Sequence, residues 1–333
     1  MHGTLPITTS TDDVGAYLAH ARAMGFRARI HAAFERADKL KITFVGETII
    51  DEYRYVKPLA KPSKEFILAT VEMRAPDRFL GGAIAASLHG EWPLATVLTD
   101  NGEPIRKTRF VDVDFSRKLF EVYSRDRIDL DEERRGRFHG KLIAVARDSD
   151  VLIVLDFGHG LMNAQERHIA ESVKFLAVNA QTNAGNYGFN PVTNYRAPHY
   201  VCVDEPEARV ATRIQNGDLP VVMAALADVM PKSKMVVTRG RYGCCVCDQT
   251  IVDDAIGQFG FTTVPPLATG GIDTIGAGDA FLAVSAPLIA AGLDLEAAAF
   301  VGNIAGAIKV SILGHQRHVG RAEVLAKVDE LLG

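Results

Sequence analysis

Short apolar segments alternate with amphipathic segments along most of this chain. The strongest of them, VLIVLDFG at 151–158, is almost continuously apolar and ends in a turn, which is typical of a buried parallel strand. The same pattern predicts further strands at 41–46, 174–179, 199–204 and 234–240. Helices are predicted between and after the strands, at 131–147, 164–174, 205–214, 217–230, 277–292 and 295–311. The alternation predicts an α/β fold, with a mostly parallel central sheet and helices on both faces.

Two regions depart from this alternation. Residues 51–125 contain segments in which apolar and polar positions alternate, such as KTRFVDVDF at 107–115. This pattern predicts an antiparallel sheet with one wet face, and we interpret part of the region as a small β lid on a domain spanning 41–333. Helical spacing is present over 12–40. The sequence leaves open whether residues 1–40 form a packed helical extension or the remnant of a lost domain.

The composition excludes several classes of protein. With 333 residues and 47% hydrophobic content, the chain can bury one large core or two smaller ones. Its 37 basic and 41 acidic side chains give a net charge of -4, which argues against a nucleic-acid partner. The sequence has no apolar run long enough to predict a membrane span, and residues 1–15 do not resemble a signal peptide.

Four cysteines are present, and three of them lie close together on one predicted strand. They are Cys202, Cys244, Cys245 and Cys247. Neighbouring side chains on a strand point to opposite faces, and no second Cys or His pair lies at the spacing of a metal site. We therefore expect four small buried side chains in a protein of the reducing cytoplasm.

Polar residues and glycines follow the predicted strands. They are Glu47 and Asp51, Asp156 with Gly158 and Gly160, Asn179, Asp204 with Glu207, and Gly240. Ligands of such sheets bind outside the carboxyl ends of the strands. The sequence thus predicts a functional edge there.

The segment ATGGIDTIGAGDAF at 268–281 is dense in glycine and leads directly into an apolar helix. Glycines let a backbone approach a ligand closely, and the free N–H groups of a helix start attract anions. Asp279 lies in the first turn, where an acid is often only a favourable helix-start residue. The segment matches neither a Walker loop nor a dinucleotide-binding loop. A phosphate cradle beside a carboxylate fits phosphoryl transfer to an alcohol.

DTIGAGDAF, at 273–281, resembles the C-terminal signature of the ribokinase (PfkB) carbohydrate kinases. The resemblance implies a ribokinase-like fold over roughly 41–320, with ATP as phosphoryl donor. It also implies that Asp279 is the catalytic base and that the N–H groups of Gly276, Ala277 and Gly278 form the anion hole.

Two segments resemble the sugar-binding half of the family, namely GETIIDEY at 46–53 and FLGGAIAAS at 79–87. The spacing, together with KTR at 107–109 and DFGHG at 156–160, is most similar to the bacterial heptose-7-phosphate kinases. The resemblance implies that the substrate is contacted by Asp51, Gly81, Gly82, Lys107, Arg109 and Asp156. Lys107 and Arg109 are candidates for the substrate's own phosphate, with solvated strand charges as the alternative.

On the nucleotide side, the resemblance places five residues at ATP: Thr238, Gly240, Gly243, Thr274 and Asn303. VDEPE at 203–207 takes the place of the family's Asn-x-x-Glu motif, which implies that Asp204 and Glu207 hold Mg²⁺ through water. The resemblance leaves room for a monovalent cation near the anion hole. It also implies a homodimer formed through the β lid.

Three departures from the family lie on the acceptor side. They are Ala85 in place of Asn, His159 in place of Lys, and an Asn-rich, aromatic segment at 179–195. The Asn-rich segment suits polar contacts to an unusual ligand. The sequence therefore favours a kinase of a sugar or sugar phosphate, with heptose phosphate first. A nucleoside or other small-alcohol kinase and a nucleotide-binding regulator without turnover are the alternatives.

Overall fold

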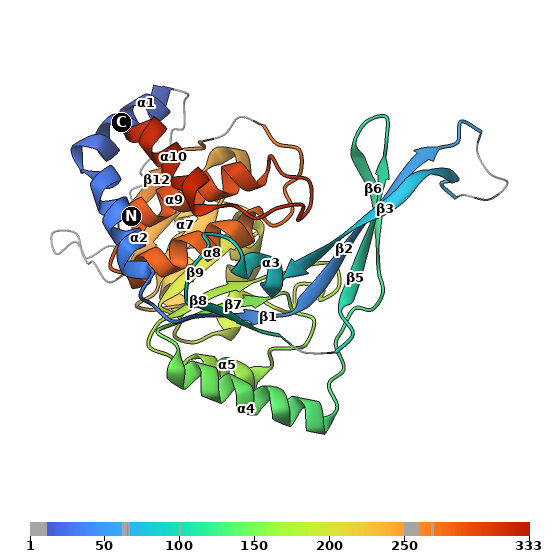
Figure 1. Cartoon of the computed structure of the whole chain (residues 1–333), viewed down its shortest axis with the longest axis horizontal. Coiled ribbons are helices and arrows are strands. Elements are labelled where there is room, and N and C mark those ends of the chain that lie inside the picture. The colour runs from blue at the N-terminus through green and yellow to red at the C-terminus, as the bar shows by residue number, and fades with distance from the viewer. Residues whose placement is uncertain (1–11, 62–64, 66, 100–101, 250–259, 268–269) are drawn as a thin grey trace.

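The computed structural model describes residues 12–61, 65, 67–99, 102–249, 260–267 and 270–333. Part of the glycine-dense segment, residues 268 and 269, and most of the segment 1–15 lie outside this range. Two sheets are present, one of eight strands and one of four (Figure 1). The order of the large sheet is β12-β11-β10-β9-β8-β7-β1-β4.

The strands of the large sheet are parallel from β4 to β10, and β11 is antiparallel to both of its neighbours. They are β1 (Ile42–Gly46), β4 (Ala95–Leu98), β7 (Val151–Asp156), β8 (Leu176–Ala180), β9 (Tyr200–Asp204), β10 (Lys234–Thr238), β11 (Cys244–Asp248) and β12 (Phe261–Val264). Five of them correspond to the strands predicted from apolar runs. The predicted mostly parallel α/β fold is confirmed.

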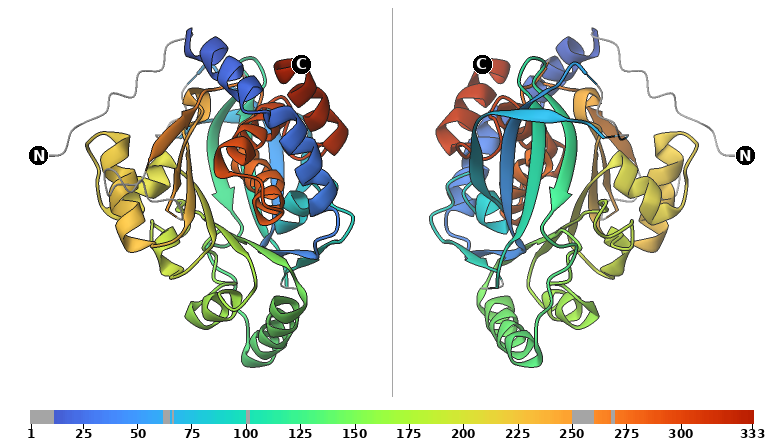
Figure 2. Two further views of the ribbon diagram at one scale, coloured as in Figure 1. Left: turned by 90° about the vertical axis from the view of Figure 1, so that its left-hand side faces the viewer. Right: turned by 90° about the vertical axis from the view of Figure 1, so that its right-hand side faces the viewer.

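Helices cover both faces of this sheet, as Figure 2 shows. On one face lie α1 (Asp12–Ala23), α2 (Phe26–Ala37), α3 (Ala83–Ser87), α8 (Ala277–Ala290), α9 (Leu295–Lys309) and α10 (Arg321–Leu332). On the other lie α4 (Glu132–Asp148), α5 (Ala164–Ala170), α6 (Glu205–Thr212) and α7 (Leu219–Val229). Two short 3₁₀ helices, η1 (Val192–Asn194) and η2 (Gly240–Tyr242), lie in connecting loops.

The apolar run of β7 explains why both faces are covered. Val151, Ile153 and Leu155 belong to the core beneath α8 and α9, whereas Leu152 and Val154 belong to the core beneath α4 to α7. Alternate side chains of a strand point to opposite faces, so a continuous apolar strand needs an apolar layer on each side. The four cysteines are buried in these same cores, and their predicted burial is confirmed.

The helices of the N-terminal region pack into the main core. Phe26, Ile30 and Phe34 of α2 are buried in the cluster that contains α8 and α9. The ring of Phe34 stacks on Trp92, with 5.4 Å between the centroids. Residues 12–37 thus form a packed extension of the domain. None of the helices in the described part of the chain is long and apolar enough to cross a membrane.

The small sheet, which we call the lid, has the order β3-β2-β5-β6. Its strands are β2 (Thr48–Pro58), β3 (Thr70–Gly82), β5 (Ile105–Asp112) and β6 (Arg117–Tyr123). Because β2 begins two residues after β1 ends, the lid extends from the carboxyl edge of the large sheet (Figure 1).

The lid is not wholly antiparallel, as the sequence pattern predicted, because β2 and β5 pair in parallel. After β3 the chain passes through α3 into β4, which pairs with β1 at the edge of the large sheet. It then re-enters the lid as β5 in the same direction as β2. The parallel register places Asp51 opposite Lys107 and Tyr53 opposite Arg109.

Candidate active site

The start of α8 forms a tight turn that only glycine fits well. Gly276 has φ 75°, and a side chain there would come within 2.9 Å of His315 and 3.2 Å of Lys309. The first turn of the helix leaves backbone N–H groups without acceptors inside the helix. The Ala277 N–H donates a long hydrogen bond of 3.3 Å to the Thr274 carbonyl, so this N–H already has a partner. The turn therefore presents N–H donors at the positive end of a helix, which suits an anion.

Asp279 lies in the same first turn and is 7% exposed. One of its carboxylate oxygens, Oδ1, is buried and has no hydrogen-bond partner among the described residues. Burial raises the pKa of Asp279 to about 6, although His315 and Lys309 act to lower it. A buried carboxylate with a free oxygen and a pKa close to neutrality has the properties of a general base.

Asp273 binds the same turn to the lid. Its carboxylate accepts hydrogen bonds from Tyr53 Oη at 2.7 Å and Lys118 Nζ at 2.8 Å, both from lid strands. It also accepts from the backbone N–H groups of Gly314 at 3.0 Å and Ile275 at 3.2 Å. Burial acts to raise the pKa of Asp273, but the hydrogen bonds from Lys118 and Tyr53 lower it to about 2. This carboxylate is therefore a charged structural centre.

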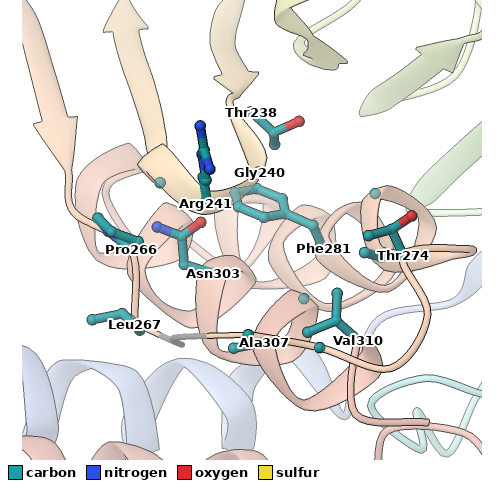
Figure 3. Close-up of a pocket in the computed structure, with 16 residues that line it drawn as sticks. Thr238, Gly240, Arg241, Pro266, Leu267, Thr274, Phe281, Asn303, Ala307 and Val310 are labelled. Carbon is teal, nitrogen blue, oxygen red and sulfur yellow. The ribbon is translucent and has the colours of Figure 1, made fainter. Parts of the chain in front are cut away.

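A cavity of about 300 Å³ opens beside the start of α8 (Figure 3). All five residues that the sequence assigned to ATP line it: Thr238, Gly240, Gly243, Thr274 and Asn303. The wall also contains Phe281, Arg241, Leu267 and Val310. Ala277 and Gly278 line the cavity as well, so it extends to the residue before Asp279. An apolar cavity with a few polar groups and a helix start at one end suits a nucleotide.

The acceptor-side residues of the lid lie near Asp279. Asp51, 3% exposed, binds Arg109, and its Oδ2 lies 3.3 Å from Nε2 of His315. Burial acts to raise the pKa of Asp51, but His315 and Arg109 lower it below its ordinary value. Gly81 packs so closely on Oδ2 of Asp51 that any side chain would collide with it. Gly82 follows at the start of α3.

Lys107 and Arg109 are not the solvated strand charges that the alternative required. The Arg109 side chain is 11% exposed and pairs with both Asp51 and Glu121, at 2.6 Å for Glu121. Lys107 is 6% exposed, and its Nζ lies 5.0 Å from the centre of the Tyr123 ring. Burial lowers the pKa of Lys107. Among the described residues, Arg109 is ion-paired with carboxylates and Lys107 is not, so the Lys107 ammonium is better placed for an anion.

Asp156, at the end of β7, is fully buried. It binds Arg167 at 3.1 Å, Tyr195 Oη at 2.9 Å and Asn190 Nδ2 at 3.1 Å. Its assignment to substrate binding stays a prediction, and its contacts are those of a residue that positions the following loop.

The Asn-rich segment uses its amides to fold on itself. Asn183 Nδ2 donates to the Phe157 carbonyl at 2.7 Å, and Asn186 Nδ2 donates to the Gln181 carbonyl at 2.9 Å. These two amides therefore bind the backbone, and the expected polar contacts of the segment to a ligand stay a prediction. Tyr187 is 82% exposed. Among the departures, His159 is buried beside this segment with Nε2 unpartnered.

Asp204 and Glu207 form a capping box at the start of α6. The Glu207 N–H donates to Asp204 Oδ1 at 2.7 Å, and the Asp204 N–H donates to Glu207 Oε2 at 3.0 Å. Burial and the neighbouring Asp204 raise the pKa of Glu207 to about 8. Two carboxylates that repel each other in this way favour the binding of a positive charge beside them. In the described part of the chain, no group of three or more His, Cys, Asp or Glu side chains could hold a metal directly.

Lys309 and His315 were not identified from the sequence. Both residues follow the turn at the start of α8 in the sequence, and atoms of both lie next to Gly276. The one available signal was a lysine within the apolar run NIAGAIKV at 303–310.

Comparison with known proteins agrees with this geometry. A family model described as "pfkB family carbohydrate kinase" matches residues 189–319. Over these residues the chain is similar to the pfkB family of carbohydrate kinases. The matched residues include the start of α8 and most of the cavity wall.

The curated relatives of this chain are distant. It is 24% identical, over 91% of its length, to the bifunctional protein HldE of Citrifermentans bemidjiense. The alignment covers 66% of that protein, so the chain spans about two thirds of the length of its relative.

Solved structures share the fold of the chain. Phosphofructokinase-2 from Escherichia coli, in complex with potassium, has a TM-score of 0.64 at 13% identity, over 88% of this chain and 99% of that one. The same enzyme is also known in a tetrameric inhibited form. A nucleoside kinase from Burkholderia thailandensis, in complex with inosine, has a TM-score of 0.60 at 18% identity, over 88% and 99% of the two chains.

The burial of Asp279 has a measurable effect on stability. Its pKa is raised from 3.8 to about 6 in the folded chain, so folding favours the protonated form. The stability contribution of that form is complete below about pH 4 and is lost as the pH rises through about 6. Asp279→Asn removes the buried charge, and we expect it to stabilise the protein by about 1–3 kcal/mol at pH 7.5 and by less at pH 5.

Denaturant unfolding at the two pH values measures this difference. The matched control is Asp148→Asn, since the Asp148 side chain is 75% exposed, and it should change stability by less than about 0.5 kcal/mol. A destabilised Asp279→Asn protein at pH 7.5 would contradict the electrostatic assignment.

Proposed function

We propose that this chain transfers the γ-phosphoryl group of ATP to a hydroxyl group of a sugar or sugar phosphate, with a heptose phosphate as the favoured acceptor. The observation that carries the proposal is the position of Asp279. It lies at the start of α8 beside the cavity suited to a nucleotide. The charges of Asp51 in the lid and of His315 in the loop after α9 both act on its pKa. A base between a donor site and an acceptor site is the arrangement that direct transfer requires.

In the proposed reaction, Asp279 accepts the proton of the attacking hydroxyl. The N–H groups of Gly276 and Gly278 stabilise the charge that develops on the transferring phosphoryl group, and the weakly bonded N–H of Ala277 lies between them. The cavity holds the adenosine portion against Phe281 and Asn303. Mg²⁺, when bound through water to Asp204 and Glu207, would neutralise phosphate charge. Because neither carboxylate pairs directly with a cationic side chain, both fit that role.

The acceptor is proposed to lie against Asp51 and Gly81, where a carboxylate can bind sugar hydroxyls. Lys107 is buried in the same lid and provides the positive charge for a phosphate on the acceptor. The choice of heptose rests on the resemblance to heptose-7-phosphate kinases and is supported by the distant relative named bifunctional protein HldE.

The base is tested with Asp279→Asn. This change removes the proton acceptor but keeps the shape of the side chain, so kcat should fall on the order of a hundredfold or more. The wild-type rate should also fall below about pH 6, because Asp279 is then protonated. An ATP-coupled screen of heptose, hexose and pentose phosphates and of nucleosides first identifies the best acceptor.

Binding of ATP by the variant, measured by calorimetry, is the control for an intact donor site. Near-normal transfer by Asp279→Asn would eliminate Asp279 as the base. Tight ATP binding by the wild type without turnover on any acceptor would instead favour a nucleotide-binding regulator.

A nucleoside or other neutral alcohol is the second candidate acceptor. The similarity of the fold to a nucleoside kinase favours it. Lys107 separates the two candidates, because a buried ammonium stabilises an anionic acceptor far more than a neutral one. Lys107→Met should raise KM for a phosphorylated sugar roughly tenfold or more, while changing KM for its neutral counterpart by less than about threefold.

Arg106→Met is the matched control for this test. Arg106 is the preceding residue on β5 and points to the exposed side, so its loss should leave both KM values unchanged. Equal effects of Lys107→Met on the two acceptors would favour the neutral acceptor.

We also propose that the lid forms a homodimer. The side of the lid that faces away from Asp273 exposes Leu80, Phe120 and Val122 at 55%, 42% and 50%. Leu80 lies on β3 and the other two on β6, the two edge strands of the lid, and exposed apolar side chains on one face of a sheet favour a protein contact. Val122→Glu should convert a dimer to a monomer in light scattering. Val221→Glu on α7, at an equally exposed position, should not. A monomeric wild-type protein at micromolar concentration would contradict the dimer.

A further inference from the structure

Lys309, the last residue of α9, has a side chain that is fully buried. Lysine is rarely buried in this way unless its charge is compensated. Its Nζ donates hydrogen bonds to the carbonyl oxygens of Ile275, at 2.8 Å, and Gly314, at 2.6 Å. Both acceptors are therefore backbone groups, and neither is a carboxylate.

The two carbonyls belong to the segments that shape the anion hole. Ile275 directly precedes Gly276, and the aliphatic end of Lys309 lies against Gly276 itself. Gly314 lies in the loop after α9, and its N–H donates to Asp273 at 3.0 Å. The ammonium thus joins the turn before α8 to the loop after α9.

Backbone carbonyls that converge on one point are the usual ligands of a dehydrated monovalent cation such as potassium. An ammonium group can occupy the same position, since it is a compact positive charge with three donors. Burial lowers the pKa of Lys309 below its ordinary value. The carboxylates of Asp273, Asp279 and Asp51 act in the opposite direction and favour the charged form. The point where the two carbonyls meet is consequently filled by a charge that the chain itself supplies.

We propose that the Lys309 ammonium takes the place of a bound monovalent cation and positions the anion-hole turn, so that this chain needs no potassium. This inference rests on the proposed binding of ATP at the start of α8. Because the Lys309 ammonium already binds these two carbonyls, they leave no place for the monovalent cation that the resemblance suggested near the anion hole. Lys309 is a positioning residue, because it acts through the backbone of Ile275 and Gly276.

The wild-type protein provides the first test. The affinity for Mg·ATP is measured by calorimetry in potassium chloride and in tetramethylammonium chloride at equal ionic strength. Tetramethylammonium is too large to enter a site of this kind. We expect the two Kd values to agree within about twofold, because the site is already filled. A Kd that improves severalfold in potassium would overturn the proposal.

Lys309→Met provides the second test, since methionine keeps much of the side-chain volume and removes the charge. In tetramethylammonium the variant should bind Mg·ATP roughly tenfold or more weakly than the wild type. Potassium or ammonium ions should restore much of the affinity by entering the vacated carbonyl site. Lys141→Met, at an exposed position on α4, is the control and should show neither effect.

A purely structural role of Lys309 predicts a different result, namely weak binding that no cation restores, and that result would overturn the proposal. Unchanged affinity in a folded Lys309→Met protein would overturn it as well. If the variant does not fold, the comparison of the two salts with the wild type still decides. Absence of ATP binding by the wild type in both salts would instead overturn the proposed function, on which this inference depends.

Discussion

The candidate active site depends on the carboxylate of Asp273. This group accepts hydrogen bonds from two lid strands, through Tyr53 and Lys118, and from the backbone on both sides of the site, through Ile275 and Gly314. Each of these bonds ends on a charged acceptor in a largely buried setting, where such bonds are strong. Asp273 thereby joins the lid, the turn before α8 and the loop after α9, beside the apolar cluster in which Ile275 and Leu313 pack with Tyr53.

Three carboxylates, Asp51, Asp273 and Asp279, all act on the charge of Lys309, yet their own surroundings differ. Asp273 and Asp51 have cationic partners, and their pKa values are lowered. Asp279 has an unpartnered oxygen, and its pKa is raised. Groups of the same type whose pKa values are driven apart can take different roles, and in the proposed reaction only Asp279 exchanges a proton.

Local sequence patterns predicted the elements that depend on nearby residues. The apolar run of β7 and the glycines before α8 determine a buried strand and a helix-start turn from residues within a few positions of each other. The parallel pairing of β2 with β5 was not predicted, because it follows from the excursion of the chain through β4. Lys309 was overlooked for a similar reason, since its partners Ile275 and Gly314 come from different segments.

The same distinction separates the proposed donor side, whose five predicted residues line one cavity, from the proposed acceptor side. A phosphate cradle is made largely of backbone N–H groups, which one short motif can specify. The acceptor side is made of side chains from several segments, and their roles depend on which partners the fold brings to them. Arg109 is held by Asp51 and Glu121, whereas Lys107, two residues earlier on the same strand, is not paired in this way. Changes in the lid can therefore alter the choice of acceptor while the turn before α8 and its donor chemistry are retained.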